Sequence, residues 1–409
     1  MSQTDDFSEV EYQVWCDRAD ASKQLGQYEE AIEHCDRALV ICPTGHSAWN
    51  HRGIALHRLG RYQEAVASYD RAIQSLPTFH TAWYNRGLSL EKLNQEIAAL
   101  ASYETVVQLQ PDHAPAWRKR GKIFAALERY EDAIASYDKV LSLVPDDAES
   151  WQRRGESLRR LGQDEAALSS YGTALELNPD DCSAWKARAN LLFDLQRDSE
   201  GLQCLDRVLE LDPHDYQTWN LKAIVLARLD QWEQEIDSRD SALQLNSTDP
   251  EMWIQQAASL QKLRRYEEAV ISYDHALELQ PDNYQLWHQR GLVLRRLGRF
   301  EGAIASFNQA LSLNPDYYPA TRSRLYLLLS TGQIVGHLLG NCSVIERQSL
   351  WNDLQHASQS FVKTKLPALV ILGLTALFST HSKGLALAIA AVFTIIAIWS
   401  DVIREADKG

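Results

Sequence analysis

Charged side chains recur along this sequence at an interval of 34 residues, and they are its first candidates for chemistry. The basic members of the series are Arg18, Arg52, Arg86, Arg120, Arg154, Arg188 and Arg290, with Lys222 in the same position. The acidic members are Asp36, Asp70, Glu104, Asp138, Asp206, Asp240 and Asp274. A row of arginines could bind an acidic ligand, because a guanidinium group pairs with a carboxylate through two hydrogen bonds. The equal spacing of both signs favours a repeated ion pair between packed helices, such as Arg86 with Glu104 or Arg120 with Asp138.

The sequence contains no arrangement of residues typical of a catalytic or metal site. Its twelve histidines include no His-Glu-x-x-His pair, its six cysteines include no Cys-x-x-Cys pair, and its glycines form no phosphate-binding loop. Cys35 falls on the expected core face of a helix, where packing is a more common role than reactivity. We therefore predict no enzymatic activity, no catalytic or metal-binding residue and no cofactor.

Tryptophans mark the elements that must position the charged series. They fall every 34 residues, at Trp15, Trp49, Trp83, Trp117, Trp151, Trp185, Trp219, Trp253 and Trp287. In residues 46–79, the reference repeat below, the apolar positions have the spacing of two successive helices with one buried face each. Gly60 permits a left-handed residue where the first helix ends, and Pro77 cannot continue the second. Such units bury their faces only by stacking on their neighbours.

Seven positions recur together in this order, represented in the reference repeat by Trp49, Gly53, Leu56, Ala65, Tyr69, Ala72 and Pro77. This pattern resembles the tetratricopeptide repeat (TPR) family of bacterial type. The resemblance implies an all-α, right-handed superhelical solenoid of about nine helix–turn–helix repeats over residues 12–317. We place a polar lead-in at 1–11, a degenerate repeat and capping helices at 318–365, a hydrophobic helical hairpin at 366–400 and a polar tail at 401–409.

In this family the first helices of the repeats form a concave wall that binds partners. The resemblance therefore assigns partner binding to Asn50, Ile54, Tyr84, Leu88, Arg118, Lys122, Gln152, Arg159, Lys186, Asn190 and Asn220. Repeats four and five also concentrate positive charge, at Arg118, Lys119, Lys122, Arg153, Arg159 and Arg160. In a chain with a net charge of -14, this basic patch indicates an acidic or carboxylate-bearing partner. The alternative is an ordinary solvated helix face, because Glu149 and Glu156 lie among these residues.

Three repeats depart from the pattern. Repeat one has Ala19 and Cys35 in place of the glycine and the aromatic residue, and repeat six has Gly201 and Leu205 on its second helix. Repeat seven departs most, because Glu235 and Arg239 replace the alanine and the aromatic residue. We expect this repeat to be the loosest, unless Trp232 fills the gap.

Two uncharged apolar runs, 366–380 and 385–400, follow the repeats. As helices they would measure about 22–24 Å, which is short against a hydrocarbon core of ~30 Å. A membrane hairpin that enters and leaves on one side fits this length, and a soluble pair of buried helices is the alternative. Basic residues flank the outer ends, so we expect the solenoid on the cytoplasmic side of a membrane.

The overall prediction is a membrane-tethered scaffold or adaptor that binds a protein or peptide in its groove. The acidic composition argues against nucleic acid as a partner. Two other functions are compatible with the same features: a chaperone-like assembly factor for membrane complexes, and a regulatory subunit of a separate enzyme. A stable partner would indicate the scaffold, a changing set of clients the chaperone, and a co-purifying activity the subunit.

Overall fold

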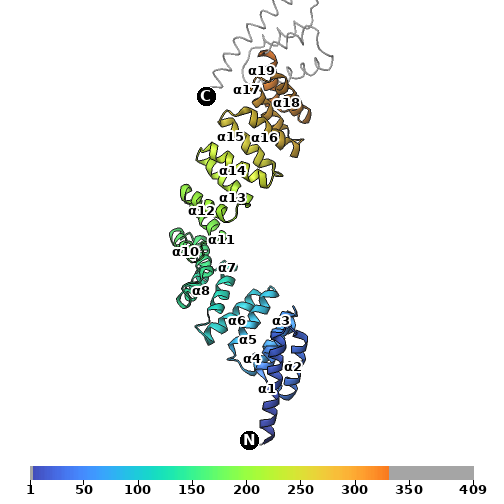
Figure 1. Ribbon diagram of the computed structural model, residues 1–409, viewed down its shortest axis with the longest axis vertical. Coiled ribbons are helices and arrows are strands. Elements are labelled where there is room, and N and C mark those ends of the chain that lie inside the picture. The colour runs from blue at the N-terminus through green and yellow to red at the C-terminus, as the bar shows by residue number, and fades with distance from the viewer. Residues whose placement is uncertain (1–2, 331–409) are drawn as a thin grey trace, which may run out of the picture. The chain divides into compact units, whose positions relative to one another are not determined.

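The computed structural model describes residues 3–330, which form nineteen helices and contain no strand. The chain divides into two compact units, Met1–His214 (unit 1) and Asp215–Gly409 (unit 2). Within each unit, every helix packs against the next one along the chain, as Figure 1 shows. The all-α repeat fold predicted from the sequence is therefore confirmed for the described residues.

Unit 1 holds the first twelve helices, which are α1 (Gln3–Gln24), α2 (Tyr28–Ile41), α3 (His46–Arg58), α4 (Tyr62–Ser75), α5 (His80–Lys92), α6 (Glu96–Leu109), α7 (Ala114–Ala126), α8 (Tyr130–Leu143), α9 (Ala148–Arg160), α10 (Asp164–Leu177), α11 (Cys182–Asp194) and α12 (Asp198–Leu211). Unit 2 holds α13 (Tyr216–Arg228), α14 (Trp232–Leu245), α15 (Pro250–Lys262), α16 (Tyr266–Leu279), α17 (Tyr284–Arg296), α18 (Phe300–Leu313) and α19 (Tyr318–Ser330). Helix α1 begins at Gln3, inside the predicted lead-in, so residues 3–11 are helical.

The turn between the two helices of a repeat requires a left-handed residue in all nine repeats. Gly60 supplies it in the reference repeat, with φ of 78°. Five repeats place another residue there, namely Asn94, Glu128, Gln196, Asp230 and Arg264, with φ between 56° and 60°. A side chain in this region costs about 1–2 kcal/mol, so packing of the helices imposes the turn even where the sequence lacks glycine.

The close approach of the two helices depends on a glycine that faces an aromatic ring. A Cβ atom at Gly53 would lie 2.5 Å from the Tyr69 ring, so no larger residue fits without a shift. The same contact recurs at Gly87 with Tyr103, Gly121 with Tyr137, Gly155 with Tyr171 and Gly291 with Phe307. Repeat one replaces both partners, because buried Ala19 and buried Cys35 take these positions.

In seven of the nine repeats, the tryptophan side chain donates a hydrogen bond to the loop that precedes its helix. Trp49 Nε1 donates a hydrogen bond of 2.9 Å to the carbonyl oxygen of Pro43, and Trp83, Trp117, Trp151, Trp185 and Trp287 bond the equivalent proline in the same way. Trp253 makes this bond with Ser247, at 3.0 Å. The carbonyl oxygen is therefore the required partner, and proline contributes only by ending the preceding helix.

Repeats six and seven close their gaps in different ways. In repeat six, the Phe193 ring lies against Gly201, where all repeats but the seventh have alanine. In repeat seven, Glu235 and Arg239 are 0% and 1% exposed, and Arg239 Nε lies 2.5 Å from Glu235 Oε1. The departure predicted from the sequence is thus an ion pair buried inside the repeat, and Trp232 is only half-buried.

Helix α19 has the position predicted for the first helix of a partial tenth repeat, with Arg324 and Leu328 buried. Among residues 3–330, no helix combines the length and the apolar character needed to cross a membrane. The predicted capping helices up to residue 365, the hairpin 366–400 and the tail 401–409 lie outside the described residues.

Candidate functional site

The first helices of successive repeats lie beside one another and form one side of each unit, called the first-helix face below. In unit 1, α1 contacts α3, α3 contacts α5, and α7 and α11 both contact α9. In unit 2, α17 contacts α19. All the predicted groove residues belong to these helices.

At the start of the first-helix face, the predicted groove residues pack into the solenoid. Asn50 is 4% exposed, and its Oδ1 accepts a hydrogen bond of 3.0 Å from Asn85 Nδ2. Ile54 packs against the buried cluster of Leu56, Ala65 and Tyr69. Asn50 is therefore a link between α3 and α5, and its side chain is not open to a partner, contrary to what the resemblance implies.

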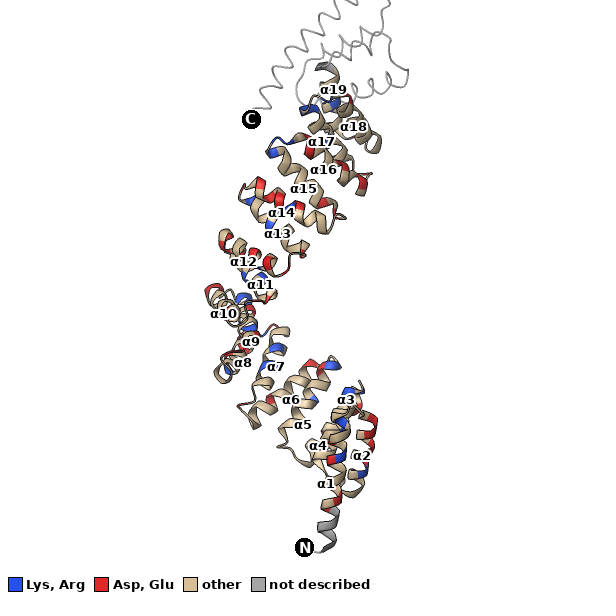
Figure 2. Cartoon of the chain, in the orientation of Figure 1, with Lys and Arg blue, Asp and Glu red and all other residues tan. Residues whose placement is uncertain are grey.

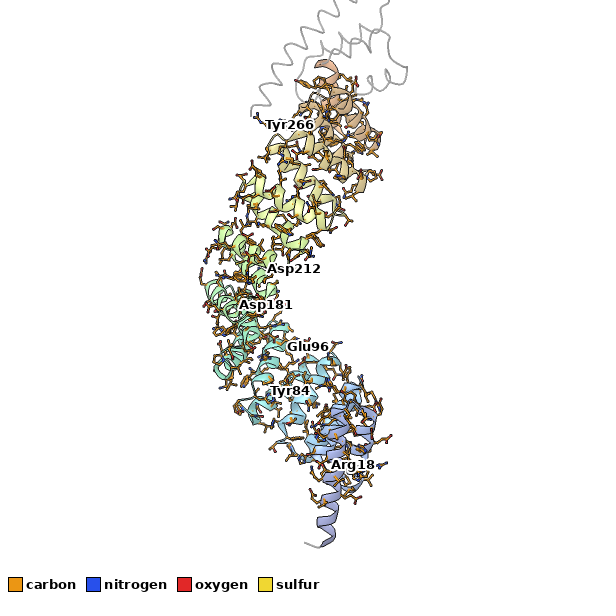
Figure 3. All side chains as sticks on the ribbon, viewed as in Figure 1. Arg18, Tyr84, Glu96, Asp181, Asp212 and Tyr266 are labelled. Atoms are coloured by element: carbon orange, nitrogen blue, oxygen red, sulfur yellow. The ribbon has the colours of Figure 1, made fainter. Side chains whose placement is uncertain are left out.

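Repeat three carries a half-buried group of rings on this face, formed by His80 and Tyr84 of α5 and by His113, the residue before α7. The Tyr84 ring lies 4.9 Å from that of His113, and His80 lies 6.2 Å from His113. Burial raises the pKa of the Tyr84 hydroxyl, and it lowers the pKa of His113, whose Nδ1 accepts the backbone N–H of Ala116. Leu88 packs nearby as a half-buried residue, and Tyr84 is labelled in Figure 3.

Four of the six residues of the predicted basic patch are paired with acids. Arg118 binds Asp147 at 2.8 Å, Lys119 binds Glu91 at 2.8 Å, and Arg159 binds Asp194 at 2.6 Å. Arg153 lies 3.6 Å from Glu149. Figure 2 shows positions of basic and of acidic residues interspersed along the helices of both units. Much of the charge that the sequence suggests for an acidic ligand is therefore balanced within the protein.

The remaining predicted groove residues differ in how available they are. Lys122 and Asn190 are exposed, and Lys122 has no ion pair among the described residues. Gln152 is half-buried and lies 2.7 Å from Ser183 Oγ, in the next first helix. Lys186 is half-buried in α11. Asn220, in unit 2, accepts a hydrogen bond of 2.9 Å from Arg239, so the buried ion pair of repeat seven occupies its Oδ1.

The charged series forms a ladder of hydrogen bonds between repeats, which confirms the ion-pair interpretation. Arg86 Nε donates to Asp70 Oδ1 at 2.7 Å, and its Nη1 donates to Ser102 Oγ at 2.8 Å. Arg52 and Arg154 repeat this geometry, Arg290 makes the same two contacts, and Arg120 binds Ser136 at 2.7 Å with Glu104 at 3.7 Å. Each arginine also lies over the tryptophan ring of its own helix, at 5.2–5.9 Å.

The predicted partners within this ladder are wrong. Arg86 pairs with Asp70 and not with Glu104, and Arg120 pairs with Glu104 and not with Asp138. The reason is that the first helix of a repeat lies between the second helix of the preceding repeat and its own second helix. The preceding second helix supplies the acid, and the helix of the same repeat supplies a serine. Sequence reasoning missed these serines, although they too recur every 34 residues, as at Ser68 and Ser102.

Unit 2 repeats the ring group of unit 1, with a buried histidine between two half-buried tyrosines. Tyr284, His288 and Tyr317 stand at the positions of His80, Tyr84 and His113, with ring distances of 4.8 Å and 5.4 Å from Tyr317 to Tyr284 and His288. His288 is 6% exposed, and its Nε2 lies 3.1 Å from Ser323 Oγ. Burial lowers the pKa of His288 to about 4. The group therefore differs from that of unit 1 in its central histidine, which is buried and held by Ser323.

No group of histidine, cysteine, aspartate and glutamate side chains within residues 3–330 is arranged to hold a metal ion. The buried cysteines Cys16, Cys35 and Cys204 are free thiols that lie in the core. Burial raises the pKa of the Cys35 thiol to about 12, which keeps it protonated at neutral pH.

Comparison with known sequence families supports the repeat assignment. Profiles described as tetratricopeptide repeat match residues 12–44, 46–79, 84–148, 148–181 and 284–317. A profile described as protein prenyltransferase alpha subunit repeat matches residues 198–229 and 266–297. No curated protein matches the sequence.

Many solved structures are similar in part. A tetratricopeptide repeat protein from Parabacteroides merdae is 18% identical with a TM-score of 0.44, covering 61% of this chain and 99% of that chain. YrrB, described as a TPR protein with an unusual peptide-binding site, is 18% identical with a TM-score of 0.42, covering 45% and 94%. MamA from Desulfovibrio magneticus is 18% identical with a TM-score of 0.40, covering 42% and 96%. Because the tetratricopeptide profiles coincide with the helical hairpins built on tryptophan, glycine and proline, the matched segments, which lie within residues 12–181 and 284–317, are tetratricopeptide repeats.

Proposed function

We propose that this protein is a scaffold without catalytic activity of its own, which binds a protein or peptide on the first-helix face of unit 1 and is held at a membrane by residues 366–400. The observation that carries the binding proposal is the half-buried ring group of His80, Tyr84 and His113. Rigid rings with a polar atom bind partners at a low cost in conformational entropy, which is why tyrosine is common in binding hot spots.

Lys122 supplies the charge for this site. It stands one repeat after Leu88 in the same helix position, and it is exposed without an ion pair among the described residues. The neighbouring Arg118 is engaged with Asp147, so a partner would have to compete for it. We therefore propose a peptide segment, extended or helical, that places an apolar side chain on the rings and an acidic one on Lys122.

A photo-crosslinking amino acid at Glu156 tests the binding site in native membranes. Glu156 is exposed and occupies the position of Lys122 one repeat later, so a partner lying along the first helices passes it. We expect one dominant adduct, whose yield falls with increasing salt, because charge steering weakens as salt rises. Lys122→Glu should abolish the adduct, and Lys139→Glu, an exposed position on the second helix α8, should leave it unchanged.

The outcomes of this experiment separate the candidate functions. An adduct that survives Lys122→Glu contradicts the proposed site. One constant adduct supports the scaffold, a changing set of adducts would indicate a chaperone-like assembly factor, and an enzyme as the adduct would indicate a regulatory subunit. Circular dichroism and thermal melting of both variants should match the unaltered protein, because both lysines project into solvent.

The membrane proposal rests on the two uncharged runs 366–380 and 385–400. Burying such runs in lipid is favourable by ~0.8 kcal/mol for each buried CH₂ group, which outweighs the cost of the lysines if these extend to the interface. We propose a hairpin with both ends, and hence the repeats, on the cytoplasmic side. The full chain should resist carbonate extraction from membranes, whereas a chain ending at Lys365 should be released; equal release of both would contradict the tether.

A further inference from the structure

The ladder of arginine contacts is interrupted at Arg188. In the complete ladder, the arginine binds an acid 16 residues before it and a serine 16 residues after it, as Arg154 binds Asp138 at 2.6 Å and Ser170 at 2.7 Å. For Arg188, these two positions are occupied by Gly172 and Cys204. Glycine offers no side chain, and a thiol accepts hydrogen bonds only weakly.

Arg188 nevertheless keeps the orientation of the other arginines. Its guanidinium carbon lies 5.9 Å from the Trp185 ring, as in the complete positions. Its Nε is buried and has no hydrogen-bond partner. A buried N–H of a charged group without an acceptor is unfavourable, so this atom requires an acceptor that the described residues do not supply.

A pocket opens where the missing acid would lie. Its volume is about 370 Å³, and its lining includes Gly172, Thr173 and Glu176 of α10, Arg188 and Leu192 of α11, and Arg197 just before α12. A Cβ atom at Gly172 would meet nothing within 4 Å. Every other glycine inside a described helix has a side chain within that distance, so packing does not account for a glycine in the middle of α10.

The charges around the pocket define what it accepts. Arg197 is already engaged, with Glu200 at 2.8 Å and Glu165 at 3.3 Å. Arg188 is therefore the cation of the lining that lacks an acid among the described residues. Two exposed acids, Glu165 and Glu176, also line the pocket and repel a second negative charge. Leu168 and Leu192 add apolar wall.

We propose that this pocket is a second binding site, separate from the first-helix face, which accepts one carboxylate group on Arg188 in place of the aspartate that other repeats carry. The carboxylate pairs with the guanidinium group of Arg188 where this lines the pocket, in place of the contact that Asp138 makes with Arg154, and the uncharged body of the ligand rests on Leu192 and Thr173. The carboxylate belongs either to a small monocarboxylic acid or to a single glutamate or aspartate side chain of a peptide. A ligand with two or more adjacent negative charges is disfavoured by Glu176.

The site is tested by isothermal titration of the full-length protein in detergent with N-acetyl-glutamate amide, which has a single carboxylate, and with N-acetyl-glutamine amide as the uncharged control. We expect binding of the glutamate compound only. A peptide with one glutamate and no other charge, set beside propionate, distinguishes the two sources of the carboxylate, since the tighter binder identifies the source. Absence of binding by all three carboxylates up to about 50 mM, where a millimolar ligand saturates its site, would overturn the proposal.

Two substitutions at one position make the test specific. Gly172→Asp restores the acid of the complete ladder, so it should weaken binding about tenfold or more, as expected when a charge-assisted hydrogen bond is lost to an internal competitor. Gly172→Ala adds a Cβ atom to empty space and should leave binding within about twofold, which is less than the effect of any such bond. Equal binding by both variants would overturn the site. Crosslinking from Glu156 should be unaffected by either substitution, so this proposal and that of the first-helix face fail independently.

Discussion

Repeats seven (216–249) and eight (250–283) lie next to each other in unit 2 and fill the same two core positions with different chemistry. Repeat eight has Ala269 and Tyr273, and Tyr273 accepts a hydrogen bond of 2.8 Å from Gln261 through its hydroxyl oxygen. Repeat seven has Glu235 and Arg239, whose side chains are as completely buried and bind each other at 2.5 Å. Both repeats form the same helical hairpin, α13 with α14 and α15 with α16.

The comparison shows what the hairpin requires at these positions. An arginine four residues after a glutamate reaches back along the same helix face, so the pair fills volume and neutralises its own charge. Arg239 gains a further acceptor in Asn220, on α13. The second oxygen of Glu235 remains buried without a hydrogen-bond partner. Repeat seven therefore keeps the shape of repeat eight but retains an unfavourable desolvation term that repeat eight lacks.

Removal of one member of the buried pair should lower the stability of repeat seven, and this is the largest expected effect. Arg239→Ala leaves the Glu235 carboxylate buried without its cation, and such changes cost about 3–5 kcal/mol. We expect a lower denaturant midpoint for unit 2 by chemical unfolding followed through tryptophan fluorescence. Arg264→Ala, at an exposed turn of the neighbouring repeat, is the control and should change the midpoint little. A loss below about 1 kcal/mol would show that water reaches Glu235.

Conversion of repeat seven into the pattern of repeat eight should leave the stability of unit 2 unchanged or raise it. Glu235→Ala with Arg239→Tyr replaces a buried ion pair by packed apolar surface, which is neutral or stabilising by about 1–4 kcal/mol in comparable cases. In the unaltered protein we expect faster amide exchange in residues 230–248 than in 264–282, and the double substitution should remove this difference. Equal exchange before substitution would show that the pair already restores the interface.

The repeat period made most of the fold predictable. Trp49, Gly53, Gly60, Tyr69 and Pro77 each have a function that follows from their size or backbone, and the structure confirms the helical hairpins they predict. Helix spacing also predicted that the charges pair. It could not give the partner, because sequence spacing does not distinguish the acid of the same repeat from that of the preceding repeat.

The candidate site was less predictable than the fold. The repeat period places Asn50 on the first-helix face. The side chain of Asn50 is buried, however, because it packs and bonds with Asn85 in the next repeat, which the period does not show. The sequence also suggested that Arg118 and Arg159 present positive charge to a partner, but they bind Asp147, just before α9, and Asp194, in α11. The missing acid at Gly172 is recognised only once the structure shows that each arginine binds the acid 16 residues before it.

The smallest expected effect concerns the arginine ladder, in which one repeat has glutamine in place of arginine. At the junction of repeats seven and eight, Gln256 takes the arginine position, donates to Asp240, and accepts from Ser272 at 2.8 Å. The neutral amide keeps the hydrogen bonds but supplies no positive charge. Partial burial accordingly raises the pKa of Asp240, although the hydrogen bond from Gln256 opposes this shift.

Gln256→Arg should convert this junction into the geometry of Arg290 with Asp274 and Ser306. The added cation favours the charged carboxylate, so we expect the pKa of Asp240 to fall. The gain in stability should be at most about 1 kcal/mol, because Asp240 is only partly buried and water still screens the pair. The gain depends on ionised Asp240, so it should be present at neutral pH and disappear as the pH falls through the range in which this carboxylate takes up its proton. Gln256→Arg in an Asp240→Asn background should give no gain, and a gain that persists there or at low pH would assign it to packing of the longer side chain.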